Sequence, residues 1–130
     1  MPGGGFVVRA AHYPGRAAID AYGDGGFRFA DMSHRGDLLC LPSGIYGWKA
    51  PSAVALDEAS LGRVVSEADS IEVLLVGTGT DLVPLSPPLG RCLRELGIVV
   101  EPMATGAAVR TFNVLLAEAR AVAAALIAVD

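Results

Sequence analysis

The sequence predicts one α/β domain with an N-terminal β-hairpin and a βαβα C-terminal half. Short β-prone segments separated by glycines fill residues 17–50, and helical periodicity alternates with aliphatic runs of strand length from residue 56 onward. The chain has 130 residues, of which 52% are hydrophobic and 18% charged, so it can bury one core but is too short for two ordinary domains. We therefore expect a flexible leader over 1–16 and a single domain over 17–130.

Three strands and a short edge strand are predicted in the first half. "AAIDAY" (17–22) and "FRFAD" (27–31) flank "GDGG", whose glycines can adopt the positive φ that tight hairpin turns require. "GDLLCLPSG" (36–44) is apolar on both faces and indicates a third strand. "IYGWKA" (45–50) predicts a short edge strand that ends before a proline.

The middle of the chain predicts a helix followed by a central strand. Asp57 is a good N-cap, Leu56 and Leu61 have the spacing of a hydrophobic staple, and apolar residues recur at helical spacing up to Ala68. "IEVLLVG" (71–77) is an almost unbroken aliphatic run, typical of a strand that is covered on both faces. This strand should lie in the centre of the sheet.

A second helix, a strand and a third helix complete the predicted order. Ser86 before two prolines marks a helix start and Gly97 marks its end, which places Cys92 on the apolar face of that helix. A strand follows at 98–102. The last helix is expected to run from about Gly106 to the chain end, with the alanine-rich stretch "AVAAALIAV" (121–129) as its packed end.

Composition argues against several classes of protein. The net charge is −4 and Lys49 is the single lysine, so the basic surface of a nucleic-acid binder is not expected. Cys40 and Cys92 lie among leucines without a second Cys or a His at ligand spacing, which indicates reduced core thiols and no metal site. Neither a signal peptide nor a membrane span is indicated, and we expect a cytoplasmic protein without a cofactor.

A candidate ligand site follows from the predicted topology. The strands at 71–76 and 98–102 are joined by one helix, so they should be parallel and should place Gly77 and Thr105 at the same edge of the sheet. The free N–H groups that begin the last helix favour anions at that edge. The candidate ligand-binding residues are Gly77, Thr78, Gly79, Asp81, Thr105, Gly106, Arg110 and Asn113.

Structural explanations compete with this site. "GTG" lacks the third glycine of a dinucleotide loop, no lysine follows Gly79 as in a nucleoside-triphosphate loop, and Asp81 suits a local turn acceptor. Arg110 opposes the helix dipole, which indicates either an acidic ligand or a structural pair with Asp81. His34 suits a solvated turn between strands. Trp48 is either an interaction anchor or a core residue.

Three blocks of sequence carry a resemblance to a known family. "GGFRFADMSHRGDLLCLPSGI", "EVLLVGTG" and "MATGAAVRTFNVLLAEARAVAAAL" occur in the order found in a small bacterial and archaeal family of domains of unknown function. Its eukaryotic members include the mitochondrial complex I assembly factor three and the adipogenesis-associated Mth-type domain protein. The resemblance covers about residues 17–128. It implies a three-layer fold with a mixed central sheet, a link to respiratory complex I biogenesis and no established reaction.

Two functional hypotheses remain open. Family members often carry an Asp, a Cys and a Tyr where this chain has Ala104, Val109 and Phe112, which favours a non-enzymatic binding or assembly protein. Its partners would be respiratory-complex subunits or another assembly factor, and it would make contact through the Trp48 loop and the alanine-rich last helix. The alternative is a protein that binds an anionic metabolite, or an enzyme acting on one, at the carboxyl ends of the parallel strands.

Overall fold

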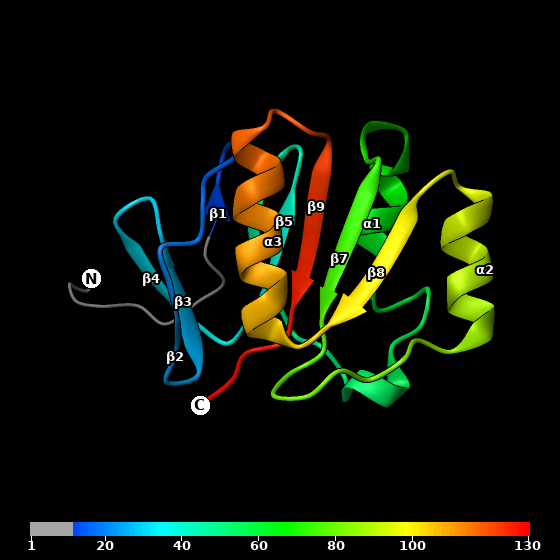
Figure 1. Ribbon diagram of the computed structural model, residues 1–130, viewed down its shortest axis with the longest axis horizontal. Helices are drawn as coiled ribbons and strands as arrows, with labels where there is room; N and C mark the ends of the chain where they lie inside the picture. The colour runs from blue at the N-terminus through cyan, green and yellow to red at the C-terminus, as the bar shows by residue number, and fades with distance from the viewer. Residues whose placement is uncertain (1–11) are drawn as a thin grey trace.

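Two sheets and three α-helices form the part of the chain that the computed structural model describes, residues 12–130 (Figure 1). The larger sheet is mixed and has the strand order β1-β6-β5-β9-β7-β8, and the smaller is the antiparallel sheet β2-β3-β4. The strands are β1 (His12–Tyr13), β2 (Ala21–Gly23), β3 (Gly26–Phe29), β4 (Met32–Arg35), β5 (Asp37–Leu41), β6 (Gly44–Trp48), β7 (Val73–Gly77), β8 (Val99–Met103) and β9 (Val122–Leu126). The α-helices are α1 (Gly62–Ser66), α2 (Pro87–Glu95) and α3 (Thr105–Ala117), and the short 3-10 helices are η1 (Ala53–Ala55) and η2 (Ala68–Ser70).

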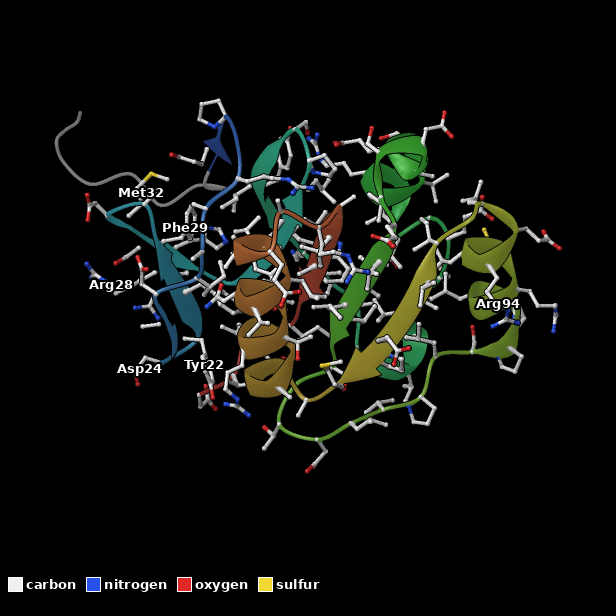
Figure 2. All side chains as sticks on the ribbon, turned by 45° about the horizontal axis from the view of Figure 1, so that its top comes forward. Tyr22, Asp24, Arg28, Phe29, Met32 and Arg94 are labelled. Carbon is white, nitrogen blue, oxygen red and sulfur yellow. The ribbon has the colours of Figure 1, made fainter. Side chains whose placement is uncertain are left out.

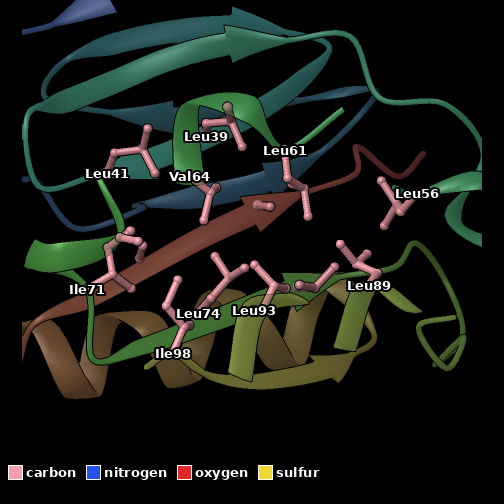
Figure 3. Close-up of a cluster of buried hydrophobic side chains, with 14 residues drawn as sticks. Leu39, Leu41, Leu56, Leu61, Val64, Ile71, Leu74, Leu89, Leu93 and Ile98 are labelled. Atoms are coloured by element: carbon pink, nitrogen blue, oxygen red, sulfur yellow. The ribbon is translucent and has the colours of Figure 1, made fainter. Parts of the chain in front are cut away.

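The large sheet is the middle of three layers, as the family resemblance implied. One face carries a core cluster that includes Val64 of α1, Leu93 of α2 and Leu74 of β7 (Figure 3). The opposite face packs against α3 and the small sheet, through residues such as Phe112 and Phe29. Each face of the sheet is thus buried by its own apolar cluster, which explains the unbroken apolar runs of the central strands.

The small sheet contains the predicted hairpin and a second hairpin that was not predicted. β2 and β3 pair antiparallel around the "GDGG" turn, although β2 begins only at Ala21. β3 then pairs with β4 through a turn in which Ala30 and Asp31 have φ values of 48° and 61°. Neither residue is a glycine, so the sequence carries no obvious signal for this turn. The prediction that His34 is a solvated turn residue is wrong, because it lies in β4 and is buried.

The order of helices and strands in the second half agrees with the prediction up to α3, although the first helix is shorter than expected. β7 pairs parallel to β8 and lies between β8 and β9, so it is an interior strand, next to the edge strand β8 and not at the centre of the sheet. Ser86 caps α2, with its hydroxyl oxygen 3.4 Å from the Leu89 amide nitrogen. The helix expected over 57–68 is shorter, because a turn in which Asp57 Oδ1 accepts from the Ser60 amide at 2.9 Å precedes α1.

The alanine-rich C-terminal segment is a strand, so the prediction that the last helix reaches the chain end is wrong. α3 ends at Ala117, and Ala119 adopts a left-handed φ of 60°. β9 then runs parallel to β7 and antiparallel to β5, with all five of its residues buried. Pairing on both sides outweighs the helix propensity of alanine. An entirely apolar run also has no periodicity that separates a buried strand from a buried helix.

Three smaller expectations also need correction or qualification. β6 is not an edge strand, because it pairs with β1 as well as β5. Cys92 is half-buried rather than a core residue, whereas Cys40 is buried as predicted. The predicted leader lies outside the described residues except for residues 12–16, where His12–Tyr13 form β1.

Candidate functional site

The carboxyl ends of β7 and β8 lie side by side, as predicted. Gly77 pairs in register with Met103, and Thr105 begins α3 directly after β8. A Cβ atom added to Gly77 would lie 3.0 Å from the Cα and Oγ1 atoms of Thr105 and from a methyl group of Leu126. Glycine at this position therefore allows close packing of β7 against α3 and β9, which is a structural reason for the first glycine of "GTG".

The Thr105 hydroxyl ties three segments of the chain together. Its side chain is fully buried, donates to the Ile127 carbonyl at 2.7 Å and accepts from the Gly79 amide at 2.9 Å. The Thr105 amide donates in turn to the Gly79 carbonyl at 2.8 Å. The first N–H group of α3, which the sequence offered for an anion, is therefore bonded to the chain itself.

Thr78 has a similar structural role in the loop after β7. Its hydroxyl donates to the Asp81 carbonyl at 2.6 Å, lies 3.1 Å from the Met103 carbonyl oxygen and accepts from the Val83 amide at 3.0 Å. Thr78 is buried, and Gly79 beside it has a φ of 107°, which suits glycine. These bonds hold the loop against the end of β8.

Among the remaining polar candidates, Asn113 forms structural hydrogen bonds, whereas Arg110 and Asp81 are exposed charges. Asn113 donates from Nδ2 to the Ile19 carbonyl at 2.8 Å and accepts at Oδ1 from the Ile19 amide at 2.9 Å, which fastens the segment before β2 to α3. Arg110 and Asp81 are both exposed. Among residues 12–130 the ion pair within 4.0 Å is Arg120 with Glu72, so Arg110 and Asp81 do not form the structural pair considered from sequence.

Tyr22 was missed by the sequence analysis and lies on the first turn of α3. Its hydroxyl contacts the position that a Cβ of Gly106 would occupy, and Figure 2 shows the ring beside the foot of the helix. The side chain is 41% exposed. Gly106 is thus explained by the close approach of this ring, and no sequence motif links the two residues.

Trp48 is fixed by the fold. The side chain is half-buried against the core cluster of Figure 3, and Nε1 donates to the Ser60 carbonyl at 2.8 Å. His34 is held by its backbone neighbours, with Nε2 3.0 Å from the Asp37 carbonyl oxygen. These contacts favour core packing, one of the two readings that the sequence left open for Trp48.

Neither a metal-binding cluster nor a groove is found at the candidate site among the features that the described residues show. Within residues 12–130, no group of three or more His, Cys, Asp or Glu side chains could hold a metal ion. A groove lies beside α2 at the start of β8, lined by Arg94, Gly97, Ile98, Val99 and Val100. No helix in this same part of the chain is long and apolar enough to cross a bilayer.

The two thiols differ in environment. Burial raises the pKa of the Cys40 thiol far above its usual value. For Cys92, partial desolvation raises the pKa first, and a hydrogen bond and the negative charges of Glu58 and Glu95 raise it further. Neither thiol is activated as a nucleophile, since a reactive cysteine requires a lowered pKa.

Known proteins resemble this chain over most of its length. An uncharacterised protein of Rhodobacter capsulatus is 39% identical over 122 residues, which cover 94% of this chain and 93% of that protein. The mouse NADH dehydrogenase [ubiquinone] 1 alpha subcomplex assembly factor 3 is 32% identical over 117 residues, 90% of this chain and 63% of the mouse protein. The chain therefore spans less than two thirds of that assembly factor.

Solved structures share the fold as well. The crystal structure of a Bartonella henselae protein, described as an outer membrane protein, matches with a TM-score of 0.87 at 60% identity, covering 92% of this chain and all of that chain. The family model for "Protein of unknown function (DUF498/DUF598)" matches residues 19–127. The resemblance inferred from the three sequence blocks is confirmed, and the chain belongs to the DUF498/DUF598 family of proteins of unknown function.

Proposed function

We propose that this chain is a non-enzymatic binding or assembly protein, linked to the biogenesis of respiratory complex I. Several vertebrate relatives are named as assembly factors of this complex, and the mouse and zebrafish proteins are 32% and 35% identical to the chain. The chain corresponds to 63% of either protein, so the link concerns the shared domain. The proposed partners are subunits of the respiratory complex or another assembly factor.

The observation that carries the proposal is that the polar side chains at the carboxyl edge of the sheet form hydrogen bonds within the chain. In open α/β enzymes this edge holds the ligand, with side chains directed at the substrate. Here Thr78, Thr105 and Asn113 each bond to backbone groups of the same chain. These side chains act as ties between segments, which suits a scaffold whose surface makes the contacts.

The surface that best suits a protein partner is formed by two loops at this edge, η1 with its flanks (residues 52–56) and the loop over residues 79–86. Both lie at the lower edge of the molecule in Figure 1. Val54 is 75% exposed and Leu82 is 57% exposed, whereas aliphatic side chains of this size usually gain by burial. Pro84 is exposed as well and restricts its loop, which lowers the entropy lost on binding.

Gene deletion with complementation tests the proposal in the source organism. Deletion should reduce the amount of assembled complex I on native gels and the NADH:ubiquinone reductase activity of membranes, while succinate:ubiquinone reductase activity stays unchanged. The parent gene should restore the complex. Val54→Asp and Leu82→Asp should restore it less well, because a charge in an apolar contact is costly. Val99→Asp is the matched control, since Val99 is 53% exposed at the other end of the sheet. Normal complex I in the deletion strain would refute the link.

The alternative function, binding of an anionic metabolite, would use Arg110. Its support is that the guanidinium is exposed and lies outside the Arg120–Glu72 ion pair of the described residues. Phosphate, sulfate or a dicarboxylate should then raise the Tm of the parent at constant ionic strength, because a ligand that binds the folded state stabilises it. Arg110→Ala should lose this rise. If none of the three anions raises the Tm of the parent protein, binding of an anionic metabolite at this site is excluded.

A further inference from the structure

The outer face of α3 carries a row of exposed side chains that the fold does not use. Thr105, Ala108, Val109 and Phe112 are the buried residues of the helix. On the opposite side, Arg110, Val114 and Glu118 are exposed, and Val114 is 57% exposed. They are spaced four residues apart, so they form one continuous ridge along the helix.

Both charges on this ridge oppose the dipole of their own helix. Glu118 is an anion at the C-cap of α3, where the negative end of the dipole lies, and Arg110 is a cation in the N-terminal half of the helix, where the dipole acts more weakly. Among residues 12–130 neither forms an ion pair within 4.0 Å. Glu118 also interacts electrostatically with Arg120. The ion pair of Arg120 is made with Glu72, whose Oε2 atom is 3.2 Å from Arg120 Nη2. The folded chain by itself therefore gives these two charges little stabilisation.

We propose that this ridge is the contact surface between two copies of the chain, whose α3 helices pack antiparallel about a two-fold axis at Val114. Arg110 and Glu118 are each four residues from Val114, so Arg110 of one copy lies opposite Glu118 of the other, twice over. Arg110 then also lies beside the C-terminal end of the neighbouring helix, whose dipole favours a cation. A two-fold contact requires a surface that is complementary to itself, and this ridge has that property.

Small side chains beside the ridge allow the two helices to approach closely. Ala107, Thr111 and Ala117 flank Val114 on the outer face, and none of them is larger than threonine. Helices pack at axis separations of about 8–10 Å when the side chains between them permit it. The apolar Val114 would be covered at the centre, with the ion pairs at the rim.

The expected dimer is weak and sensitive to salt. One helix from each copy covers less area than the roughly 1,200–2,000 Å² of a stable interface, and exposed ion pairs are screened by ions. Sedimentation velocity of the full chain should show a monomer at about 10 μM that shifts toward dimer as the concentration approaches about 1 mM, and added salt should reverse the shift.

Charge reversal separates this arrangement from any other. Arg110→Glu places two acidic groups opposite each other at both ends of the contact, and Glu118→Arg does the same with basic groups. Each single variant should raise the dimer dissociation constant about tenfold or more. The two variants mixed in equal amounts should associate with each other, because both cross-pairs are then of opposite charge. The double variant should dimerise like the parent.

Loss of the dimer cannot be confused with unfolding in this design. Each reversal puts a favourable sign at that end of its own helix, so the Tm of the dilute monomer should be unchanged or slightly higher. A structural role of Arg110 or Glu118 within the monomer would lower it. The mixing experiment adds a gain of association that damage to the fold cannot produce.

Disulfide trapping gives an independent readout of the axis. In a Cys92→Ser background, Val114→Cys should form a covalent dimer under mild oxidation, because the two thiols face each other across the axis. Val54→Cys, at a more exposed position, is the matched control and should form it much more slowly. A parent that stays monomeric at about 1 mM, or single variants that do not associate on mixing, would overturn the proposal.

Discussion

The two strands β7 and β9 lie next to each other in the same buried sheet, yet only β7 could be recognised from the sequence. β7 reads Val-Leu-Leu-Val-Gly and β9 reads Val-Ala-Ala-Ala-Leu, and they pair in parallel register throughout. β7 fills the two cores with large side chains, whereas the alanines of β9 let the layers on either side come close. The same environment thus accepts opposite local propensities, and the sheet decides the structure of β9.

The largest difference in stability is expected between substitutions at Leu75 of β7 and Ala124 of β9, which are paired in register. Both are buried on the face toward α3. Leu75→Ala should lower the free energy of unfolding by about 2–5 kcal/mol, because it leaves a cavity. Ala124→Gly should cost about 0.5–1 kcal/mol. Urea denaturation with unchanged m-values would measure both changes.

A size exchange between these two residues tests whether they share one space. Ala124→Leu alone should cost about 1–3 kcal/mol through overpacking. Combined with Leu75→Ala, its cost should fall, since the total side-chain volume is restored. Strictly additive costs would show that the two side chains do not fill the same part of the core, contrary to the register of β7 and β9.

The next largest loss of stability is expected at Thr105, whose hydroxyl group joins the segments that follow β7 and β9. Thr105→Val keeps the shape but leaves the Ile127 carbonyl and the Gly79 amide without their partner, so stability should fall by about 1–3 kcal/mol. Thr105→Ser retains the hydroxyl and is the control, with a smaller loss. Equal losses in the two variants would mean that the methyl group, and not the hydroxyl, holds the strand ends.

A smaller effect is expected at Gly77, the last residue of β7. The added methyl group of Gly77→Ala would lie 3.0 Å from Thr105 and from Leu126 of β9, so neighbouring atoms must shift. We expect a loss of about 1 kcal/mol in the free energy of unfolding. Gly62→Ala is a suitable control, because nothing lies within 4 Å of a Cβ added there. A stabilised Gly77→Ala would show that the close approach of β7 to α3 is not required.

Sequence reasoning succeeded where one local signal had one structural solution. The capping Ser86, the aliphatic run of β7 and the single helical crossover fixed α2 and the parallel pairing of β7 with β8. It failed at β9 and at the Ala30–Asp31 turn, since neither segment carries a local signal for the structure that it adopts. These structures depend on partners far away in the sequence.

In the candidate site, too, one part could be predicted from the sequence and another part could not. The positions of Gly77 and Thr105 at one edge followed from topology. That the Thr105 hydroxyl bonds to the Ile127 carbonyl could not be predicted, because residue 127 was assigned to a helix rather than to the end of a central strand. The error at β9 therefore made a buried hydroxyl group that bonds to the chain itself look like part of a vacant ligand site. It also made a buried strand look like a helical contact surface.

The last prediction uses the protein's own two thiols as probes. Cys40 pairs in register with Ala124 of β9 and is buried, and burial raises the pKa of its thiol. The thiolate is the reactive form, so Cys40 should react with a thiol reagent only when the sheet opens. Cys92 is half-buried on α2 and should react first, at one equivalent per folded chain.

The rate at Cys92 should also depend on pH with a definite sign. Partial desolvation, then the hydrogen bond and charge of Glu58, raise the pKa of Cys92, so its thiolate fraction at neutral pH is below that of a free cysteine. Labelling should accelerate as the pH rises toward the raised pKa. Glu58→Gln should lower that pKa and speed the reaction at fixed pH, while Cys40 stays protected. If both thiols of the folded chain reacted at the same rate, β9 would not close the sheet beside Cys40, and the contrast between the two strands would have to be revised.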